Sequence, residues 1–163
     1  MNQQTGIAEK LHYMFSEYLK NNKLRNTAER DAIFSKICDT KELFTLEMIL
    51  QQLENENFRV SRASIYNTME LLLDSKIVVR HQFAYTQVYY ELRHLSDEHH
   101  YVVCTNCGTV QIIENKKFNN IFSGYKIPKF TTEYHSLYFY GICSKCKYKM
   151  IREEIKQREK AKI

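Results

Sequence analysis

Four of the five cysteines in this chain of 163 residues form two C-x-x-C pairs, and their spacing constrains the fold more than any other feature. Cys104 and Cys107 make the first pair, and Cys143 and Cys146 make the second, with the 35 residues 108–142 between them. A C-x-x-C turn directs both sulfurs to one side, so two such turns on neighbouring strands can surround one metal ion as a tetrahedron. All four positions around the ion are then filled by protein. The spacing therefore predicts a structural Zn²⁺ site rather than a catalytic one.

A redox-active dithiol is the alternative for a C-x-x-C pair. It needs only one pair, at the start of a helix within a thioredoxin-like βαβ pattern, and that pattern is absent here. The fifth cysteine, Cys38, has no partner nearby in the sequence and is expected to be a small buried hydrophobe. No combination of nucleophile, base and orienting residue points to catalysis, so we expect that the chain is not an enzyme.

The composition of the chain indicates the kind of cellular compartment in which it works. With 44% hydrophobic residues it can build a core without disulfides. No apolar run approaches the roughly 18 to 20 residues of a membrane span, and the N-terminus lacks the pattern of a secretion signal. We therefore expect a soluble cytoplasmic protein with no membrane partner, where reducing conditions favour metal binding by paired cysteines over disulfides.

The formal net charge of +5 does not by itself indicate a nucleic-acid partner, because the charge is unevenly placed. Residues 1–80 hold 11 Lys/Arg and 11 Asp/Glu, and residues 81–144 hold five of each. The excess lies in the tail from Lys145, where eight basic residues face three acidic ones. DNA binding must therefore be argued from the local placement of basic side chains.

The first half of the chain has the pattern of helices followed by a hairpin. Apolar residues from Ile7 to Leu19 recur on one helical face, and three further helices are predicted to begin after the N-caps Thr27, Thr45 and Ser61. Two β-rich runs, 77–83 and 87–92, follow the fourth helix and are joined by a short turn. Helices followed by a hairpin are the winged-helix order.

The pattern of the second half predicts a small α+β domain that holds both cysteine pairs. We expect strands at 101–104, 109–113 and 130–140, a short helix at 116–123 and a basic helix from Lys145 onward. The overall fold class predicted is α+β: a winged helix-turn-helix domain over residues 1–92, a polar linker over 93–98, and a dimerisation and metal-binding domain over 99–163.

Four segments in this order resemble the ferric uptake regulator family of bacterial metal-dependent repressors, and the resemblance covers nearly the whole chain. They are Leu24–Arg30, Ser61–Asn67, His99–Gly108 and His135–Gly141, the last leading to Cys143. The resemblance implies a homodimeric transcriptional repressor of metal homeostasis, iron homeostasis included, or of oxidative stress. Its partner would be a palindromic double-stranded DNA operator.

The resemblance also implies which residues contact DNA. The helix that begins after Ser61 would be the recognition helix in the major groove. Side chains that can bond base edges, thymine methyl groups or phosphates would lie on it and near the start of the second helix. The candidates are Arg25, Arg30, Arg62, Ser64, Tyr66 and Asn67. Relatives usually carry Arg at the position of Asn67. The competing interpretation is that single surface arginines only solvate the protein.

Regulatory metal sites of the family carry over incompletely. Of the five ligands of the inter-domain site, Glu91 and His99 match, whereas Leu43, Tyr101 and Ile112 stand where relatives place two histidines and a carboxylate. Two ligands of five are too few to hold a metal at that site.

The second site, inside the dimerisation domain, keeps more of its ligands. Glu98 takes a histidine position, His100 takes an aspartate position and His135 is retained, so three side chains can still bind Zn²⁺, Fe²⁺ or Mn²⁺. The fourth ligand is open between Asn119 and Glu114. In the alternative interpretation the histidine pair is merely polar linker and His135 a hydrogen-bonded core histidine.

Loss of the bridging ligands has consequences for regulation. A bridging metal would favour a closed, DNA-competent dimer. Without it, we expect weak or absent coupling, another effector such as heme or redox state, or constitutive DNA binding. A zinc-stapled protein-interaction module that no longer binds DNA is the alternative function, and steep salt dependence of duplex affinity would separate the two.

Overall fold

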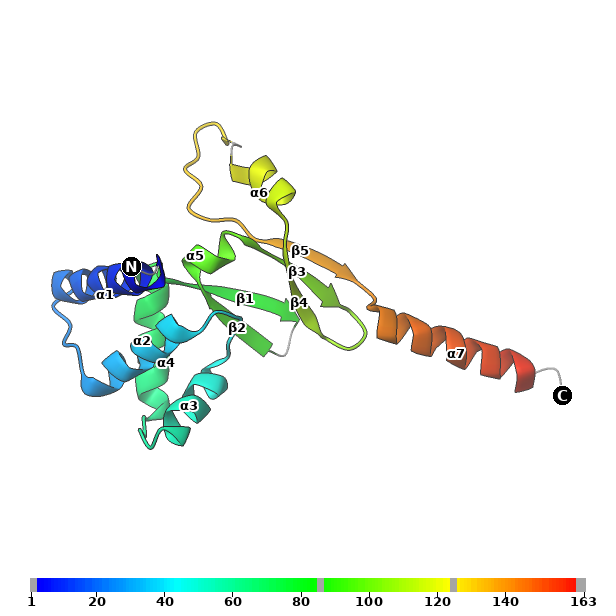
Figure 1. Cartoon of the computed structure of the whole chain (residues 1–163), viewed down its shortest axis with the longest axis horizontal. Helices are drawn as coiled ribbons and strands as arrows, with labels where there is room; N and C mark the ends of the chain where they lie inside the picture. The colour runs from blue at the N-terminus through cyan, green and yellow to red at the C-terminus, as the bar shows by residue number, and fades with distance from the viewer. Residues whose placement is uncertain (1–2, 85–86, 124–125, 161–163) are drawn as a thin grey trace. The chain divides into compact units, whose positions relative to one another are not determined.

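The computed structural model describes residues 3–84, 87–123 and 126–160, and these fold as two compact units, Met1–Ser96 and Asp97–Ile163 (Figure 1). The first unit is mainly helical and the second is built on a small sheet. The predicted α+β class is confirmed.

Helices precede a hairpin in the first unit, as the apolar pattern predicts. Its elements are α1 (Gln3–Asn21), α2 (Ala28–Asp39), α3 (Leu46–Asn55), α4 (Arg62–Asp74), β1 (Val78–Ala84), β2 (Gln87–Leu92) and α5 (Arg93–Ser96). β1 and β2 pair antiparallel. This is the winged-helix arrangement.

Each of the three predicted N-caps is present. The side-chain oxygens of Thr27, Thr45 and Ser61 accept hydrogen bonds from backbone N–H groups three residues later, at 3.3, 3.2 and 3.0 Å. Such a bond satisfies one of the N–H groups that the first turn of a helix leaves without a partner. The starts of α2, α3 and α4 are therefore determined locally.

The hydrophobic core of this unit lies between the four helices and the base of the hairpin. Its most deeply buried members, at 0 or 1% exposure, are Ile33, Phe34, Ile37, Phe44, Ile49, Ile65, Leu72 and Ile77. The hairpin is tied to the helices by Phe44, which exchanges two backbone hydrogen bonds with Tyr90 at 2.8 and 2.9 Å. The core thus fixes one face of α4 and leaves the opposite face open.

The segment predicted as a linker over 93–98 is divided between the two units. Arg93–Ser96 form the short helix α5, which belongs to the first unit, and the second unit begins at Asp97. Ser96 is buried. The hydrophilic side chains of this stretch suggested a linker. Residues 93–96 instead contact both strands of the hairpin and so belong to the first unit.

The second unit is a three-stranded mixed sheet with two helices. Its elements are β3 (His99–Cys104), β4 (Val110–Glu114), α6 (Lys116–Ser123), β5 (Leu137–Gly141) and α7 (Ser144–Lys160). The strand order is β4-β3-β5, with β4 antiparallel and β5 parallel to the central strand.

One predicted strand is shorter than expected. The pattern predicts a strand over 130–140, but only Leu137–Gly141 is one. In the parallel register Leu137 pairs with His100, one residue from the start of β3 at His99. The preceding residues therefore have almost no length of central strand to pair with.

Apolar side chains remain exposed on the second unit. The exposed ones include Ile113, Ile121, Ile127, Phe130, Phe139, Tyr140 and Ile142. Among the residues described, every helix is too short or too polar to cross a membrane.

Candidate metal centre and nucleic-acid interface

Parallel pairing of β3 with β5 explains how the two cysteine pairs meet. Cys104, the last residue of β3, is in register with Gly141, the last residue of β5. Two further hydrogen bonds extend this pairing, because Thr105 N–H and Oγ1–H both donate to the Gly141 carbonyl, at 2.8 and 3.2 Å. Parallel strands end at the same edge, so the turn after β3 and the turn before α7 lie side by side.

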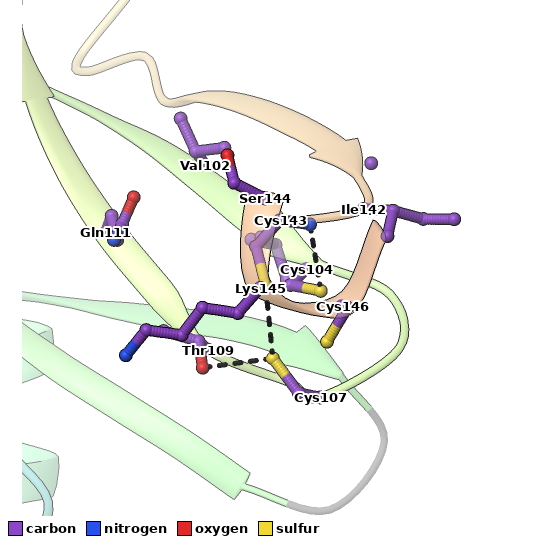
Figure 2. Close-up of a pocket in the computed structure, with 12 residues that line it drawn as sticks. Val102, Cys104, Cys107, Thr109, Gln111, Ile142, Cys143, Ser144, Lys145 and Cys146 are labelled. Atoms are coloured by element: carbon purple, nitrogen blue, oxygen red, sulfur yellow. Dashed lines mark hydrogen bonds between the residues drawn. The ribbon is translucent and has the colours of Figure 1, made fainter. Parts of the chain in front are cut away.

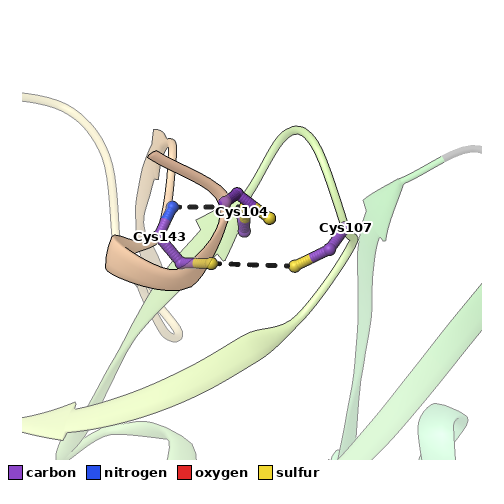
Figure 3. Close-up of side chains that lie close together, drawn as sticks. Cys104, Cys107 and Cys143 are labelled. Atoms are coloured by element: carbon purple, nitrogen blue, oxygen red, sulfur yellow. Dashed lines mark hydrogen bonds between the residues drawn. The ribbon is translucent and has the colours of Figure 1, made fainter. Parts of the chain in front are cut away.

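The four cysteine sulfurs converge there. The Sγ atoms of Cys104, Cys107, Cys143 and Cys146 all lie within 4.8 Å of one another. Cys107 Sγ and Cys143 Sγ are 3.9 Å apart (Figure 3). Four thiolates at about 2.3 Å from a tetrahedral zinc ion lie about 3.8 Å from each other. The donor set and its spacing therefore fit Zn²⁺.

Local backbone geometry shapes the first turn. Gly108 has φ of +73°, a conformation that disfavours any side chain with a Cβ, and its N–H donates to the Cys104 carbonyl at 2.9 Å. The turn closes so that Cys107 comes next to Thr109, whose Oγ1 lies 3.1 Å from the Cys107 sulfur. The hydroxyl can donate to a thiolate there.

Hydrogen bonds also tune the thiols. The backbone N–H of Cys143 lies 3.3 Å from Cys104 Sγ. This bond, together with the N–H of Cys107, lowers the pKa of Cys104 to about 6. Hydrogen bonds from Thr109 lower the pKa of Cys107 as well. For Cys146, a hydrogen bond from Asn106 lowers the pKa, but the neighbouring Cys143 sulfur, burial and then the other two sulfurs together raise it to about 11. The site therefore favours the thiolate at Cys104 and Cys107, and a cation would have to stabilise the thiolate of Cys146.

The surroundings of the sulfurs differ from one to the next. Cys104 and Cys146 are buried, Cys143 is half-buried and Cys107 is exposed. Figure 2 shows the sulfurs gathered between the turn after β3 and the first turn of α7, with the Lys145 side chain extending from that helical turn. A metal held here would join the sheet to the start of α7.

The residues of the predicted second metal site do not form such a cluster. Within the described chain, the four cysteines are the only group of three or more ligating side chains whose atoms converge, so Glu98, His100 and His135 do not form one. His100 is 1% exposed, packs edge-on against Phe118, and has no hydrogen-bond partner for either ring nitrogen among the residues described.

The two open candidates for the fourth ligand are placed differently. Asn119 donates from Nδ2 to the Glu98 carbonyl at 3.4 Å and leaves a buried Oδ1 that has no hydrogen-bond partner in the described chain. Glu114, in contrast, lies 3.9 Å from His99 across the strand pair, measured from Oε1 to Nε2. Of these two candidates, Asn119 is the one with a buried side-chain oxygen that has no hydrogen-bond partner in the described chain.

The weaker candidates Glu91 and His99 each lie close to an ionisable side chain on another strand. Glu91 Oε2 lies 3.5 Å from His81 Nε2, and both side chains are fully buried. The role of His81 was missed by sequence reasoning. Its position two residues from Val79 and Phe83, both inward-facing, is the periodic signal that could have revealed it.

The exposed face of α4 carries most of the predicted DNA-contacting side chains. Arg62, Tyr66 and Asn67 are exposed, with Tyr66 at 52%, whereas Ile65 between them is fully buried. Ser64 is half-buried and its hydroxyl lies 2.9 Å from that of the N-cap Ser61. Three of the four side chains on α4 are thus free to meet a partner, and the fourth also supports the helix start.

The two arginines near α2 have different surroundings. Arg25 is exposed. Arg30 is half-buried and donates from its guanidinium to the backbone carbonyl of Arg25. Arg30 therefore stabilises the turn between α1 and α2, and only Arg25 is fully open to solvent.

Comparisons of sequence and of structure both match this chain to ferric uptake regulators. The model of the family described as "Ferric uptake regulator family" matches residues 21–140. A ferric uptake regulation protein of Bordetella parapertussis is 31% identical over 133 residues, covering 78% of this chain and 93% of the relative. The ferric uptake regulator of Helicobacter pylori superposes with a TM-score of 0.65 at 17% identity, covering 86% of this chain and 93% of that chain. That of Pseudomonas aeruginosa, with manganese, gives a TM-score of 0.62 at 20% identity, covering 79% and 97%.

Proposed function

Because this chain belongs to the ferric uptake regulator family, whose members are metal-responsive transcriptional regulators and not enzymes, we propose that it represses transcription by binding a palindromic DNA operator as a homodimer. The genes it controls would serve metal homeostasis or the response to oxidative stress. The first unit would read the duplex, and the second would join two copies of the chain.

The observation that carries this proposal is the two-sided character of α4. Its inner face is locked into the core by Ile65, Met69 and Leu72, all at most 2% exposed. Its outer face presents Tyr66 and Asn67 to solvent. A rigid helix with hydrogen-bonding and aromatic side chains outward can enter a major groove without rearrangement.

Phosphate contacts would orient the helix on the duplex. Arg62 lies in the first turn of α4 and is exposed, as is Arg25 in the turn before α2. Cations at these places can bond the DNA backbone on either side of the groove. Arg30 would act by holding the turn that carries Arg25.

The second unit has the properties of a dimerisation domain. Both β4 and β5 are edge strands of the sheet, and apolar side chains such as Phe139 and Tyr140 are 39% and 54% exposed. A sheet this small with exposed apolar surface is stabilised by covering that surface with a second copy. Two first units would then be available for the two halves of an inverted repeat.

The four cysteines would hold one structural Zn²⁺ per chain. Such a zinc would have a structural and not a catalytic role, because protein sulfur would fill all four positions around it, and it would stabilise the junction of β3, β5 and α7.

A second divalent metal remains a prediction with one structural observation in its favour. Two buried nitrogens on His100 and one buried oxygen on Asn119 lack hydrogen bonds in the described chain, which is costly unless something binds them. Glu98 and His135 would have to move closer to complete a site. Zn²⁺, Fe²⁺ and Mn²⁺ all accept this mixture of nitrogen and oxygen ligands.

Selection from a library of random DNA duplexes tests the proposed function. We expect enrichment of an inverted repeat whose half-site centres are about one helical turn, roughly 10 base pairs, apart or a multiple of it. Affinity for the enriched duplex should fall steeply with salt, because bound phosphates release counterions. Absence of any enriched sequence, with the protein folded and zinc-loaded, would favour the protein-interaction module instead.

A further inference from the structure

Helix α7 carries charges that the proposed function does not yet use. It contains seven Lys/Arg and three Asp/Glu, and it lies beyond residue 140, where the match to the family model ends. Its residues after Cys146 are exposed throughout the described part of the helix.

The basic residues of α7 are not scattered. Five of them follow one another at intervals of four, three, four and four positions, which places them on one face of an α-helix. We call this face the basic stripe; it consists of Lys145, Lys149, Arg152, Lys156 and Lys160. The other two basic residues, Lys147 and Arg158, lie on the opposite side of the helix.

Little within the chain neutralises the basic stripe. Among the residues described, Lys149 is its only member with an ion pair, to Glu153 at 3.9 Å, and the two side chains are 77% and 60% exposed. Exposed pairs of this kind contribute little energy, so Lys149 can exchange its partner readily. The five cations therefore face solvent as a row, with the exposed Glu153 and Glu159 along its two sides.

The start of the basic stripe is anchored at the cysteine cluster. Lys145 lies between Cys143 and Cys146, on the helical turn that carries both sulfurs (Figure 2). From Lys145 to Lys160 the stripe extends about 22 Å, at 1.5 Å per residue. A duplex carries one negative charge for about every 1.7 Å of its axis, so a straight row of this length can meet several phosphates.

We propose that the basic stripe of α7 is a second DNA-contacting surface, which binds the phosphate backbone without reading sequence and adds to the affinity provided by α4. This inference rests on the proposed function, since it assumes that the protein binds duplex DNA. Anionic lipid headgroups and DNA phosphates would both attract these cations. DNA is the partner we propose, because the proposed function already brings a duplex to this protein and the length of the stripe matches a row of phosphates. The exposed apolar residues Tyr148, Ile151 and Ile155 lie on another side of α7, so binding to anionic vesicles is included in the test.

The test compares two double variants with equal charge changes on the same helix. Arg152→Gln/Lys156→Gln removes two cations from the basic stripe, and Lys147→Gln/Arg158→Gln removes two from the opposite side. Glutamine is a good helix former and all four positions are exposed, so folding and zinc content should not change in either. A second stripe variant, Lys149→Gln/Lys160→Gln, serves if the first is poorly folded.

The measurement is the slope of log Kd against log salt concentration for the full-length, zinc-loaded dimer. It is made on a mixed-sequence duplex and on the duplex enriched by selection. Each lost phosphate contact reduces the slope by about 0.9, so the stripe variant should lose up to about 1.8. Its affinity at low salt should fall about tenfold or more on both duplexes alike, because phosphate contacts carry no sequence information. The control variant should match wild type.

Three results would overturn the inference. The first is an unchanged slope in both stripe variants. The second is an equal loss in stripe and control variants, which would mean a diffuse charge effect. The third is an unchanged DNA slope with reduced binding to vesicles of phosphatidylglycerol and phosphatidylcholine, which would assign the stripe to a membrane surface. In each case wild type would still bind the enriched duplex, so the proposed function would stand. Failure of wild type to bind any duplex would remove both.

Discussion

The Sγ atoms of Cys107 and Cys143 lie 3.9 Å apart although 36 positions separate the two residues in the chain. The parallel register that places Cys104 beside Gly141 produces this approach. Because the two cysteines come from different turns, a metal bound between them links β3, β5 and the start of α7. This link would hold the second unit together at that end of its sheet.

The outer face of α4 yields the first prediction. Tyr66→Ala should weaken binding to the enriched duplex about tenfold, through loss of a contact to a thymine methyl or a phosphate. Thermal stability should hardly change, since Tyr66 is 52% exposed. Gel-shift titration and thermal unfolding of the same preparation check both parts.

Tyr13→Ala, at a position 68% exposed on α1, is the matched control and should bind like wild type. Equal affinities for wild type and the Tyr66 variant would count against α4 as the recognition helix.

The inner face of the same helix behaves differently. Ile65 is fully buried beside Tyr66, so Ile65→Ala should destabilise the first unit by about 2–5 kcal/mol through lost burial and the cavity left behind. Chemical denaturation followed by circular dichroism measures this change. A loss well below 1 kcal/mol would show that α4 is not packed as described.

The thiol of Cys38 provides a prediction about pH. Cys38, which the sequence predicts to be buried, is half-buried. This partial burial, with a smaller contribution from the Asp39 charge, raises the pKa of Cys38 from 9.0 to about 12. The folded state thus retains a proton that the unfolded chain releases above pH 9. Stability from this group is complete below pH 9 and is lost as the pH rises toward 12.

Alkylation with iodoacetamide at pH 8, followed by mass spectrometry, checks this directly. We expect Cys38 in the native protein to react much more slowly than in denaturant, because the thiolate is the nucleophile. Comparison of stability from pH 8 to 11 for wild type and Cys38→Ala should show a shallower decline in the variant. Rapid native labelling of Cys38 would contradict its placement.

The second metal can be tested through His100. If it binds at one of the two unsatisfied nitrogens of this side chain, the zinc-loaded protein should take up an additional equivalent of Mn²⁺, and His100→Leu should abolish that uptake. Isothermal titration calorimetry measures both. His12→Leu, in the first unit, is the control and should titrate like wild type. Identical titrations for wild type and His100→Leu would remove the second site from the account.

Local signals predicted the first unit well. Thr27, Thr45 and Ser61 cap their helices as expected, because an N-cap depends on residues within one turn. The hairpin also matches, with β2 at the expected Gln87–Leu92. The cysteine quartet was likewise predictable, since two C-x-x-C turns have few other uses.

The features that the sequence did not show depend on contacts between residues that are far apart in the chain. The length of β5 is set by its partner, so the alternating pattern before Leu137 was misleading. Arg93–Ser96 look like a polar linker but pack against the hairpin as α5. The buried pairing of His81 with Glu91 joins two strands, and neither side chain signals its partner by spacing alone.

Native mass spectrometry of the reduced, full-length protein tests the central claim most directly, because one spectrum reports both metal content and assembly. We predict a dimer that carries two zinc ions, one for each set of four cysteines, and a Cys143→Ser variant that retains almost none. Cys38→Ser, which removes the cysteine outside the cluster, should keep its zinc. A folded wild-type protein that is monomeric and free of zinc would contradict the account.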